Sequence, residues 1–296
     1  MKALVAAART LFLIAALGAV TVPARAQNII TDSVETAAAP RPSDVKQRTD
    51  STPPWLTRRE LTGFGVSLLA TIAVAPLDKP SSEEFQEPRW KDNRLLQNVT
   101  TDLAFAGGPG PFFVGAGLFA AGEIGRAPGL ASAGEHVTEA VVLAASLTGL
   151  GKGIFGRALP GVQTDEKFEL ARGFHRGNGP FVSFPSGHTA AAFALASSLT
   201  GEAEAWRPGL ATYVGPVSYS VASAIGLARV YQHVHWTSDL PLAAAIGTWS
   251  GLSVESHVHQ NNHASAFTHA LTAASLQYTP DGRAVLGFSM RFGAAE

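Results

Sequence analysis

The feature that most constrains the fold of this chain is a series of about six apolar segments, each long enough for a helix of several turns. They are rich in Gly, Ala, Ser and Thr, the small residues that let helices approach closely in membranes and in dense soluble bundles. The segments cover residues 61–77, 103–121, 137–151, 188–199, 210–228 and 240–254. We therefore expect an all-α fold, a bundle of about six helices.

The composition narrows the environment of this bundle. Hydrophobic residues make up 46% of the chain and charged residues 15%, whereas soluble domains usually carry roughly 25% charged residues. This fits either a tightly packed helical core or several membrane-crossing segments, and the segment lengths leave both open. The formal net charge of -1 argues against a nucleic-acid partner. Because the chain has no cysteine, disulfides, thiolate zinc sites and cysteine nucleophiles are excluded.

Residues 1–26 have the pattern of a secretory signal peptide. Lys2 and Arg9 give a short basic start, residues 11–22 are mostly apolar, and residues 24–26 form an Ala-x-Ala cleavage pattern. The apolar part is too short to cross a hydrocarbon core of about 30 Å comfortably, which disfavours an uncleaved anchor helix. We therefore expect the mature protein to work in the periplasm or cell envelope, with membrane embedding left open.

The rest of the chain divides into three parts. Residues 27–54 are polar, contain four prolines and show no apolar periodicity, which predicts a disordered linker. Residues 55–256 hold the apolar segments and form the expected helical domain. The tail, residues 257–296, contains two alternating apolar and polar stretches around Asp281-Gly282, which predicts a short β-hairpin of residues 276–278 and 286–292.

Scarce charges and histidines gather where three of the apolar segments begin or end. A connection of some 35 residues, 152–185, is long for a compact domain, so we expect it to be functional. If these segment ends lie on one face, they form a phosphate-sized pocket. The first cluster is Lys152 with Arg157, the second is Pro185-Ser186-Gly187-His188, and the third is Arg229, His235 and Asp239.

The second cluster predicts an anion site at a helix start. Gly187 lets the backbone approach a ligand closely, and an apolar helix follows at His188. The unpaired N–H groups of a first helical turn, together with the helix dipole, attract anions. A histidine at this place can donate a proton to an atom attached to the anion. Taken alone, the same residues would also fit an ordinary helix cap.

The third cluster predicts an oriented histidine. Pro241 is tolerated only in the first turn of a helix, so a helix begins near Ser238 or Asp239. Asp239 lies four residues after His235, close enough to accept a hydrogen bond from one ring nitrogen and leave the other free to attack. Arg229 brings a fork of donors that suits phosphate oxygens. Taken alone, such a set is as often structural as functional.

These clusters resemble the three motifs of the type 2 phosphatidic acid phosphatase (PAP2) and vanadium haloperoxidase superfamily over roughly residues 60–256. The resemblance implies the helical bundle of that family, and no metal ion or other cofactor. It implies that His235 attacks phosphorus to give a phosphohistidine, that Asp239 is its partner and that His188 protonates the leaving oxygen. The implied phosphate ligands are Lys152, Ser186, Gly187 and Arg229.

The first motif departs from the family pattern. Where the family usually has arginine before Pro160, this chain has Leu159. Arg157, which we count among the phosphate-binding candidates, or a loop arginine (Arg172 or Arg176) is expected to supply the missing charge. A milder departure is Ala228, where the family usually has serine before the arginine of the third motif.

The leading hypothesis is a metal-independent phosphatase that hydrolyses a phosphomonoester or a lipid phosphate on the periplasmic side. One alternative is a vanadate-dependent haloperoxidase. The other is a catalytically weakened phosphate- or phospholipid-binding envelope protein, to which Leu159 points. A metal site among His257, His259, His263 and His269 is disfavoured, because Glu255 is the only carboxylate beside them and cysteine is absent. His233 is expected at the rim of the pocket.

Overall fold

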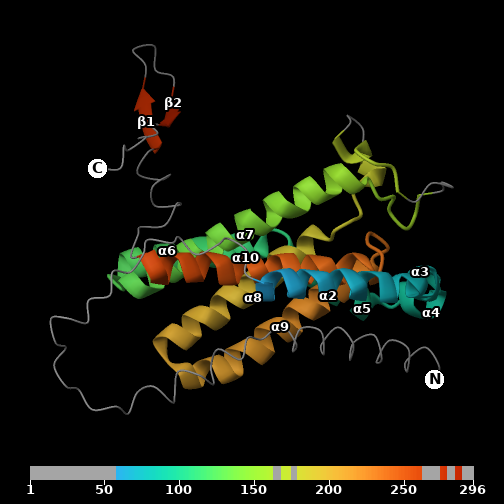
Figure 1. Cartoon of the computed structure of the whole chain (residues 1–296), viewed down its shortest axis with the longest axis horizontal. Coiled ribbons are helices and arrows are strands. Elements are labelled where there is room, and N and C mark those ends of the chain that lie inside the picture. Colours follow the sequence, from blue (N-terminus) through green and yellow to red (C-terminus); the bar gives the residue numbers. More distant parts are fainter. Residues whose placement is uncertain (1–57, 163–167, 175–178, 262–273, 279–283, 289–296) are drawn as a thin grey trace.

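The computed structural model describes residues 58–162, 168–174, 179–261, 274–278 and 284–288, and these residues are mostly helical (Figure 1). The all-α prediction is therefore confirmed. The α-helices are α2 (Arg58–Val74), α3 (Asp78–Gln86), α4 (Pro88–Lys91), α5 (Arg94–Gly107), α6 (Gly110–Gly125), α7 (Pro128–Phe155), α8 (Gly187–Trp206), α9 (Pro208–Tyr231) and α10 (Asp239–Asn261). Short 3-10 helices cover Ala75–Leu77, Arg172–Phe174 and Gly179–Phe181.

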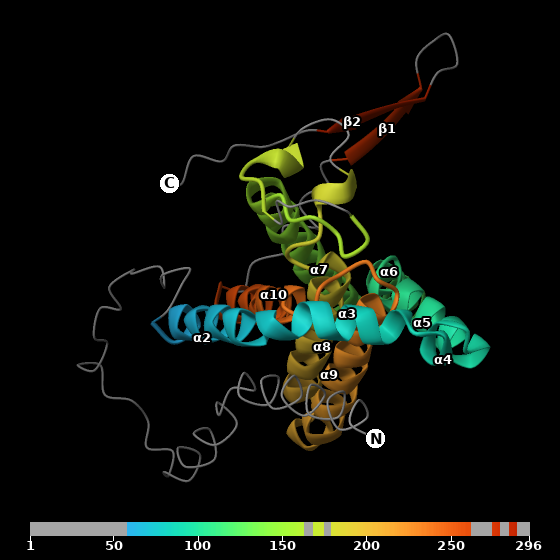
Figure 2. The same ribbon diagram turned by 90° about the vertical axis from the view of Figure 1, so that its right-hand side faces the viewer.

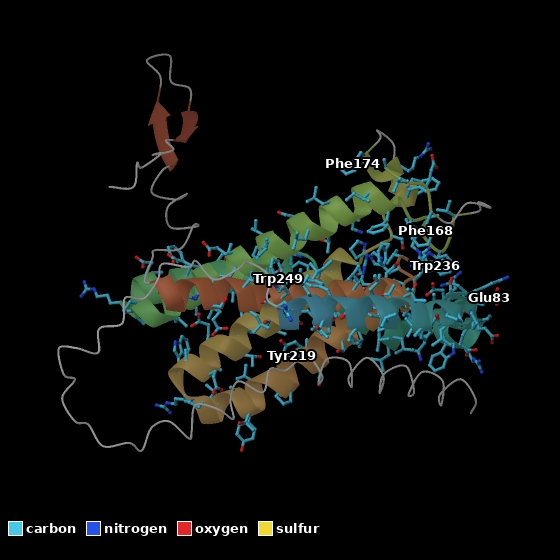
Figure 3. All side chains as sticks on the ribbon, in the orientation of Figure 1. Glu83, Phe168, Phe174, Tyr219, Trp236 and Trp249 are labelled. Atoms are coloured by element: carbon cyan, nitrogen blue, oxygen red, sulfur yellow. The ribbon has the colours of Figure 1, made fainter. Side chains whose placement is uncertain are left out.

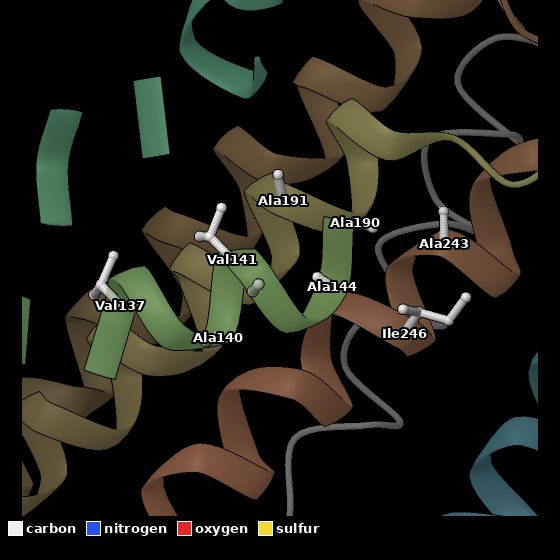
Figure 4. Packing of buried hydrophobic residues seen from close by; sticks show 9 residues of the cluster. Val137, Ala140, Val141, Ala144, Ala190, Ala191, Ala243 and Ile246 are labelled. Carbon is white, nitrogen blue, oxygen red and sulfur yellow. The ribbon is translucent and has the colours of Figure 1, made fainter. Parts of the chain in front are cut away.

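The core lies where α7, α8 and α10 meet. Most of its buried side chains are alanines, which bring the helix backbones close together (Figure 4). A Cβ built on Gly247 of α10 would lie 2.1 Å from the carbonyl oxygen of Ala190 on α8, so this crossing requires glycine. The cluster consists of Val137, Ala140, Val141, Ala144, Ala190, Ala191, Ala194, Ala243 and Ile246.

The expected helix over residues 103–121 is two helices. Helices α5 and α6 meet at Gly108 with a bend of 54°. Pro109 cannot donate a backbone hydrogen bond to continue α5, and it takes the N-terminal cap position of α6 instead. The polar residues that follow the apolar segment 61–77 also form helices, α3 and α4. The described residues therefore contain more helices than the six we expected.

The connectivity brings four helix ends to one end of the bundle. Helices α7 and α8 run in opposite directions, as do α9 and α10, so the end of α7, the start of α8, the end of α9 and the start of α10 lie together (Figures 1 and 2). Helix α3 packs against the same end, in contact with α9 and the loop after it. The three sequence clusters therefore share one end of the molecule.

Three helical stretches are long and apolar enough to cross a membrane: Glu60–Gln86, Pro128–Phe155 and Pro208–Tyr231. The bent pair α5 and α6 would make a fourth if it counts as one broken span. Large apolar side chains on these stretches are exposed, among them Leu69, Phe113 and Tyr213. An exposed apolar surface of this extent is unusual for a soluble monomer.

Strands β1 (Ala274–Tyr278) and β2 (Ala284–Phe288) pair antiparallel, with Ala274 opposite Phe288. This is the hairpin that the alternation in the tail predicts, although both strands begin two residues earlier than expected. The signal peptide expected at residues 1–26 and the linker expected at residues 27–54 lie outside the described residues.

Candidate active site

His235 and Asp239 form a buried pair where α10 begins. Nδ1 of His235 lies 3.3 Å from Oδ2 of Asp239. Since the carboxylate can only accept, Nδ1 carries the proton and Nε2 keeps a free lone pair. Burial lowers the pKa of His235, and the hydrogen bond to Asp239 opposes that effect. The ring is therefore neutral near pH 7, with one nitrogen able to act as a nucleophile. The sequence prediction that α10 begins near Asp239 is confirmed.

The carboxylate of Asp239 is held by other donors as well. Its Oδ2 accepts hydrogen bonds from the hydroxyl of Ser183, at 2.6 Å, and from the backbone N–H of Trp236, at 2.8 Å. Its Oδ1 accepts one from Nη1 of Arg157. With donors on both oxygens, the carboxylate cannot rotate freely, and the ring of His235 is fixed with it.

His188 lies in the first turn of α8 and faces the break between α5 and α6. A Cβ built on Gly108 would lie 3.0 Å from Nε2 of His188. The pKa of His188 is lowered to about 4, first by burial and then by nearby charges, among them those of Arg229 and Lys152. These mutual influences mean that the side chains of all three sequence clusters act on one small volume.

Two cations border this volume. Lys152, in the last turn of α7, donates a hydrogen bond to the carbonyl oxygen of Val182. Arg229, in the last turn of α9, donates from Nη1 to the side chain of Gln232. Its Nε is buried and has no hydrogen-bond partner among the described residues, so this arginine keeps donor capacity for a ligand.

The start of α8 completes the site. Ser186 is the N-cap residue, and its buried hydroxyl accepts hydrogen bonds from the backbone N–H and the hydroxyl of Thr189. At Gly187, an added Cβ would meet nothing closer than Cε of Lys152 at 3.8 Å, so the lysine stem runs past this helix end. Unpaired N–H groups of the first turn and the lysine ammonium together favour an anion here.

Arg157 does not match its predicted role. The structure buries its guanidinium behind Asp239, with Nη1 bonded to Asp239 and Nη2 bonded to Oδ2 of Asp78 at 2.7 Å. The side chain lies between the rings of Phe168 and Trp236, at 4.9 and 5.5 Å from their centroids. A phosphate ligand would have to displace two carboxylates to reach it, so the phosphate-binding prediction for Arg157 is corrected.

Among the described residues, no loop arginine supplies the positive charge that is missing at Leu159. Arg172 pairs with Glu169 at 3.4 Å and stacks over the ring of Phe181. Arg176 lies outside the described residues. The cations that we can assign to the pocket are therefore Lys152 and Arg229.

A cleft of about 550 Å³ runs along α3 at the same end of the molecule. It is lined among others by Leu159, Trp236 and His233, and Nδ1 of His233 lies 2.9 Å from the hydroxyl oxygen of Ser82. The expected position of His233 at the rim of the catalytic pocket stays a prediction, because the proposed catalytic residues are not among those that line this cleft. Figure 3 shows Trp236, Phe168 and Glu83 at this end of the molecule, with Tyr219 and Trp249 nearer its middle.

Sequence reasoning missed Asp78, Ser183 and Ser238, which all bind the buried charges around His235. The sequence holds one indication of these partners, because Asp78 is the first charged residue after the apolar segment over residues 61–77. In the described part of the chain, no group of three or more His, Cys, Asp or Glu side chains could hold a metal ion. The side chains of the histidine cluster at residues 257–269 lie outside the described residues.

Residues 136–264 match the PAP2 superfamily. A stretch of 69 residues is 39% identical to a lipid A 1-phosphatase of Porphyromonas gingivalis. That match covers 23% of this chain and 15% of the relative's length. A solved transmembrane PAP2-type phosphatidylglycerolphosphate phosphatase of Bacillus subtilis is 19% identical, with a TM-score of 0.45, over 69% of this chain and 96% of that one.

Proposed function

We propose that this chain, whose residues 136–264 match the PAP2 superfamily, is a metal-independent phosphatase that acts through a phosphohistidine intermediate. The observation that carries the proposal is the His235–Asp239 pair, in which Nδ1 is bound to a buried carboxylate and Nε2 is free. A neutral, oriented imidazole beside two cations is suited to attack an anionic phosphorus centre.

In the first step, Nε2 of His235 attacks phosphorus while the P–O bond to the leaving group breaks. His188 gives its proton to the departing oxygen, so that an alcohol leaves rather than an alkoxide. The phosphorylated ring keeps its proton on Nδ1, and Asp239 stabilises the positive charge that develops there. Lys152, Arg229 and the amides at the start of α8 stabilise the charge on the phosphoryl oxygens.

In the second step, a water molecule attacks the phosphorus of the phosphohistidine. His188, now neutral, takes a proton from that water, and the P–N bond breaks with its electron pair returning to Nε2 of His235. Inorganic phosphate leaves, and both histidines are back in their starting protonation states.

His188 must carry a proton for the first step, although burial, together with the charges of Arg229 and Lys152, lowers its pKa to about 4. A bound phosphate opposes this shift, because its negative charge lies next to Lys152 and Arg229 and favours the protonated form of His188. The substrate thereby raises the pKa of the group that protonates its leaving oxygen.

We further propose a phosphorylated lipid as the substrate and a membrane-embedded site. The candidate spans in α2, α7 and α9 carry exposed apolar side chains, and the catalytic groups lie at one end of these helices, at the level where lipid headgroups would be. The similarity to a lipid A 1-phosphatase supports a lipid phosphate. The export pattern in residues 1–26 supports a place in the cell envelope.

One observation favours a second candidate, a phosphate- or phospholipid-binding protein with weak activity. Arg157 is bound to carboxylates and Leu159 is uncharged, so the pocket has fewer assigned cations than the family pattern provides. Phosphate release separates the two candidates, since a binding protein retains substrate without turning it over.

The test uses the full chain purified in detergent, with a lipid phosphate and a soluble phosphomonoester as substrates. We expect release of inorganic phosphate, and a quenched reaction should trap a phosphoryl group that is labile in acid and stable in alkali, as phosphohistidine is. The His235→Ala variant should lose more than about 1000-fold in kcat and trap nothing. Failure of the wild type to hydrolyse either substrate would reject the enzyme in favour of the binding protein.

A further inference from the structure

We propose that Asp78 and Arg157 are positioning residues for the nucleophile, acting on His235 through Asp239. The expected effect on kcat rests on the proposed function, whereas the expected effect on the orientation of His235 rests on geometry alone. Asp78 is the first residue of α3 and lies outside the region that matches the PAP2 superfamily. A helix before the matched region would thus complete the catalytic centre.

Arg157 links two carboxylates that are far apart in the sequence. Its Nη2 donates to Oδ2 of Asp78 at 2.7 Å, and its Nη1 donates to Oδ1 of Asp239. The guanidinium is planar and rigid. When Asp78 holds Nη2 in place, it therefore also sets the direction of Nη1, which donates to Asp239. The link therefore runs from α3 to the carboxylate that orients His235.

Ser238 provides a second link that does not pass through the guanidinium. Its backbone N–H donates to Oδ1 of Asp78 at 2.8 Å, and its hydroxyl donates to Oδ2 at 2.7 Å. Ser238 directly precedes Asp239, so Asp78 holds the backbone at the start of α10. The hydroxyl oxygen of Ser238 also accepts from Nη1 of Arg157 at 2.8 Å, which closes the network.

The charges of this network suit the catalytic cycle. Asp78, Arg157 and Asp239 are all buried, with exposed fractions of 7%, 5% and 0%. Two carboxylates and one guanidinium leave one net negative charge, which complements the positive charge that His235 carries as a phosphohistidine. Without Asp78, the guanidinium would neutralise Asp239, and the stabilisation of that positive charge would be lost.

Helix α3 is held in the position that this role requires. The hydroxyls of Ser81 and Thr237 are 2.6 Å apart, and Ser82 bonds the ring of His233. Both contacts join α3 to the loop that carries His235. A buried ion pair could also serve folding alone, so the experiment must separate catalysis from stability.

The first experiment uses Asp78→Asn. Asparagine has the same shape as aspartate, but its NH2 group replaces one of two oxygens that both accept hydrogen bonds, so a donor would face a donor. Ser238 and Arg157 offer three hydrogens to the carboxylate, and an amide oxygen can accept only part of them. We expect kcat to fall about 10- to 100-fold and KM to change less than about 3-fold. The reason is that the substitution removes a hydrogen-bond partner that orients an active-site residue. Asp102→Asn, an exposed aspartate on α5, is the matched control and should leave kcat unchanged.

The second experiment is a double-mutant cycle. If Asp78 acts in part through Arg157, the loss caused by Asp78→Asn should be smaller in an Arg157→Leu background, and the remaining loss reports the link through Ser238. Losses that multiply would contradict a shared path. If Asp78→Asn fails to fold, Ser238→Ala serves as the milder variant, because it removes one hydrogen bond to Asp78 and keeps the backbone one.

The third experiment does not depend on turnover. The ¹⁵N NMR signals of His235, assigned by their loss in His235→Gln, should report a proton on Nδ1 in the wild type and a mixture of tautomers in Asp78→Asn. Unchanged tautomers together with unchanged kcat in Asp78→Asn would overturn the inference. A wild type without phosphatase activity would reject the proposed function instead, and the tautomer result would still decide the role of Asp78.

Discussion

Gly108 and His188 face each other across the break between α5 and α6: a Cβ built on Gly108 would lie 3.0 Å from Nε2 of His188 and 3.2 Å from the carbonyl oxygen of Ala104. That is closer than side-chain atoms normally approach. The absence of a side chain at Gly108 therefore gives the imidazole its place at the pocket.

The first prediction follows from this contact. Gly108→Ala should displace the ring of His188 by a few tenths of an ångström and lower kcat about 10-fold, because proton transfer depends on position. Gly117→Ala in α6 is the control, since nothing lies within 4 Å of its added Cβ. Equal kcat values for the two variants would show that the ring adapts without loss.

The second prediction concerns the leaving group. His188→Ala should slow hydrolysis of an alkyl phosphate about 100-fold or more and that of nitrophenyl phosphate much less, because nitrophenolate leaves without a proton. The measurement is kcat/KM for both substrates with wild type and variant. Equal losses would mean that His188 holds the phosphate rather than protonating the leaving oxygen.

The third prediction is a pH dependence. The pKa of His188 is lowered to about 4 in the free protein, so its protonated form is lost as the pH rises above that value. Activity measured as kcat/KM should then decline toward neutral pH. A bound phosphate raises this pKa, so the decline of kcat should lie at higher pH than the decline of kcat/KM. The profiles of wild type and His188→Ala are measured with the alkyl phosphate of the second prediction, whose leaving oxygen needs a proton, and the variant gives the contribution of the substrate's own ionisation. Superimposable profiles for wild type and variant would remove His188 as the titrating acid.

The sequence predicts the parts of this site that are local in the chain. His235 and Asp239 are four residues apart, and Ser186, Gly187 and His188 open one helix, so spacing and helix-start signals suffice to find them. Apolar runs likewise identify the helices of the bundle. The break at Gly108 was missed because residues 103–121 are uniformly apolar, and hydropathy does not register a turn inside such a run.

The sequence could not predict the partners of Arg157. Asp78 lies 79 residues before it and Asp239 lies 82 residues after it, and nothing in their local sequences links them. The expectation that Arg157 binds phosphate followed from its place near Lys152. Only packing decides whether a guanidinium at this distance from the lysine faces the pocket or the carboxylates behind it.

The fourth prediction concerns ions. Vanadate should inhibit competitively, because its trigonal bipyramidal form resembles the phosphoryl transition state that Lys152 and Arg229 stabilise. EDTA should leave kcat unchanged. Loss of activity with EDTA that a divalent metal restores would overturn the metal-free mechanism. Oxidation of bromide by peroxide with added vanadate would support the haloperoxidase alternative.

The last prediction concerns Leu159, which stands where the family usually has arginine. From the sequence we expected Arg157 or a loop arginine to supply the missing charge. Arg157 instead holds Asp78 and Asp239, and Arg172 pairs with Glu169. Arg172→Ala should therefore change kcat/KM less than about 3-fold, as a surface substitution away from the site does.

A pocket short of positive charge should gain from a new one. Leu159→Arg places a guanidinium at the edge of the cleft and should raise kcat/KM about 5-fold or more, since a charge contact in a partly water-excluded site is worth on the order of 1–3 kcal/mol. Glu83 and Glu87 line the same cleft and compete for that guanidinium. The gain should therefore increase when Leu159→Arg is combined with Glu83→Gln. Leu159→Met controls for shape without charge. The outcome against this prediction is that kcat/KM of Leu159→Arg, alone or with Glu83→Gln, does not exceed that of the wild type, while Leu159→Met equals the wild type. Lys152 and Arg229 would then already neutralise the phosphate, and leucine at position 159 would have no catalytic cost.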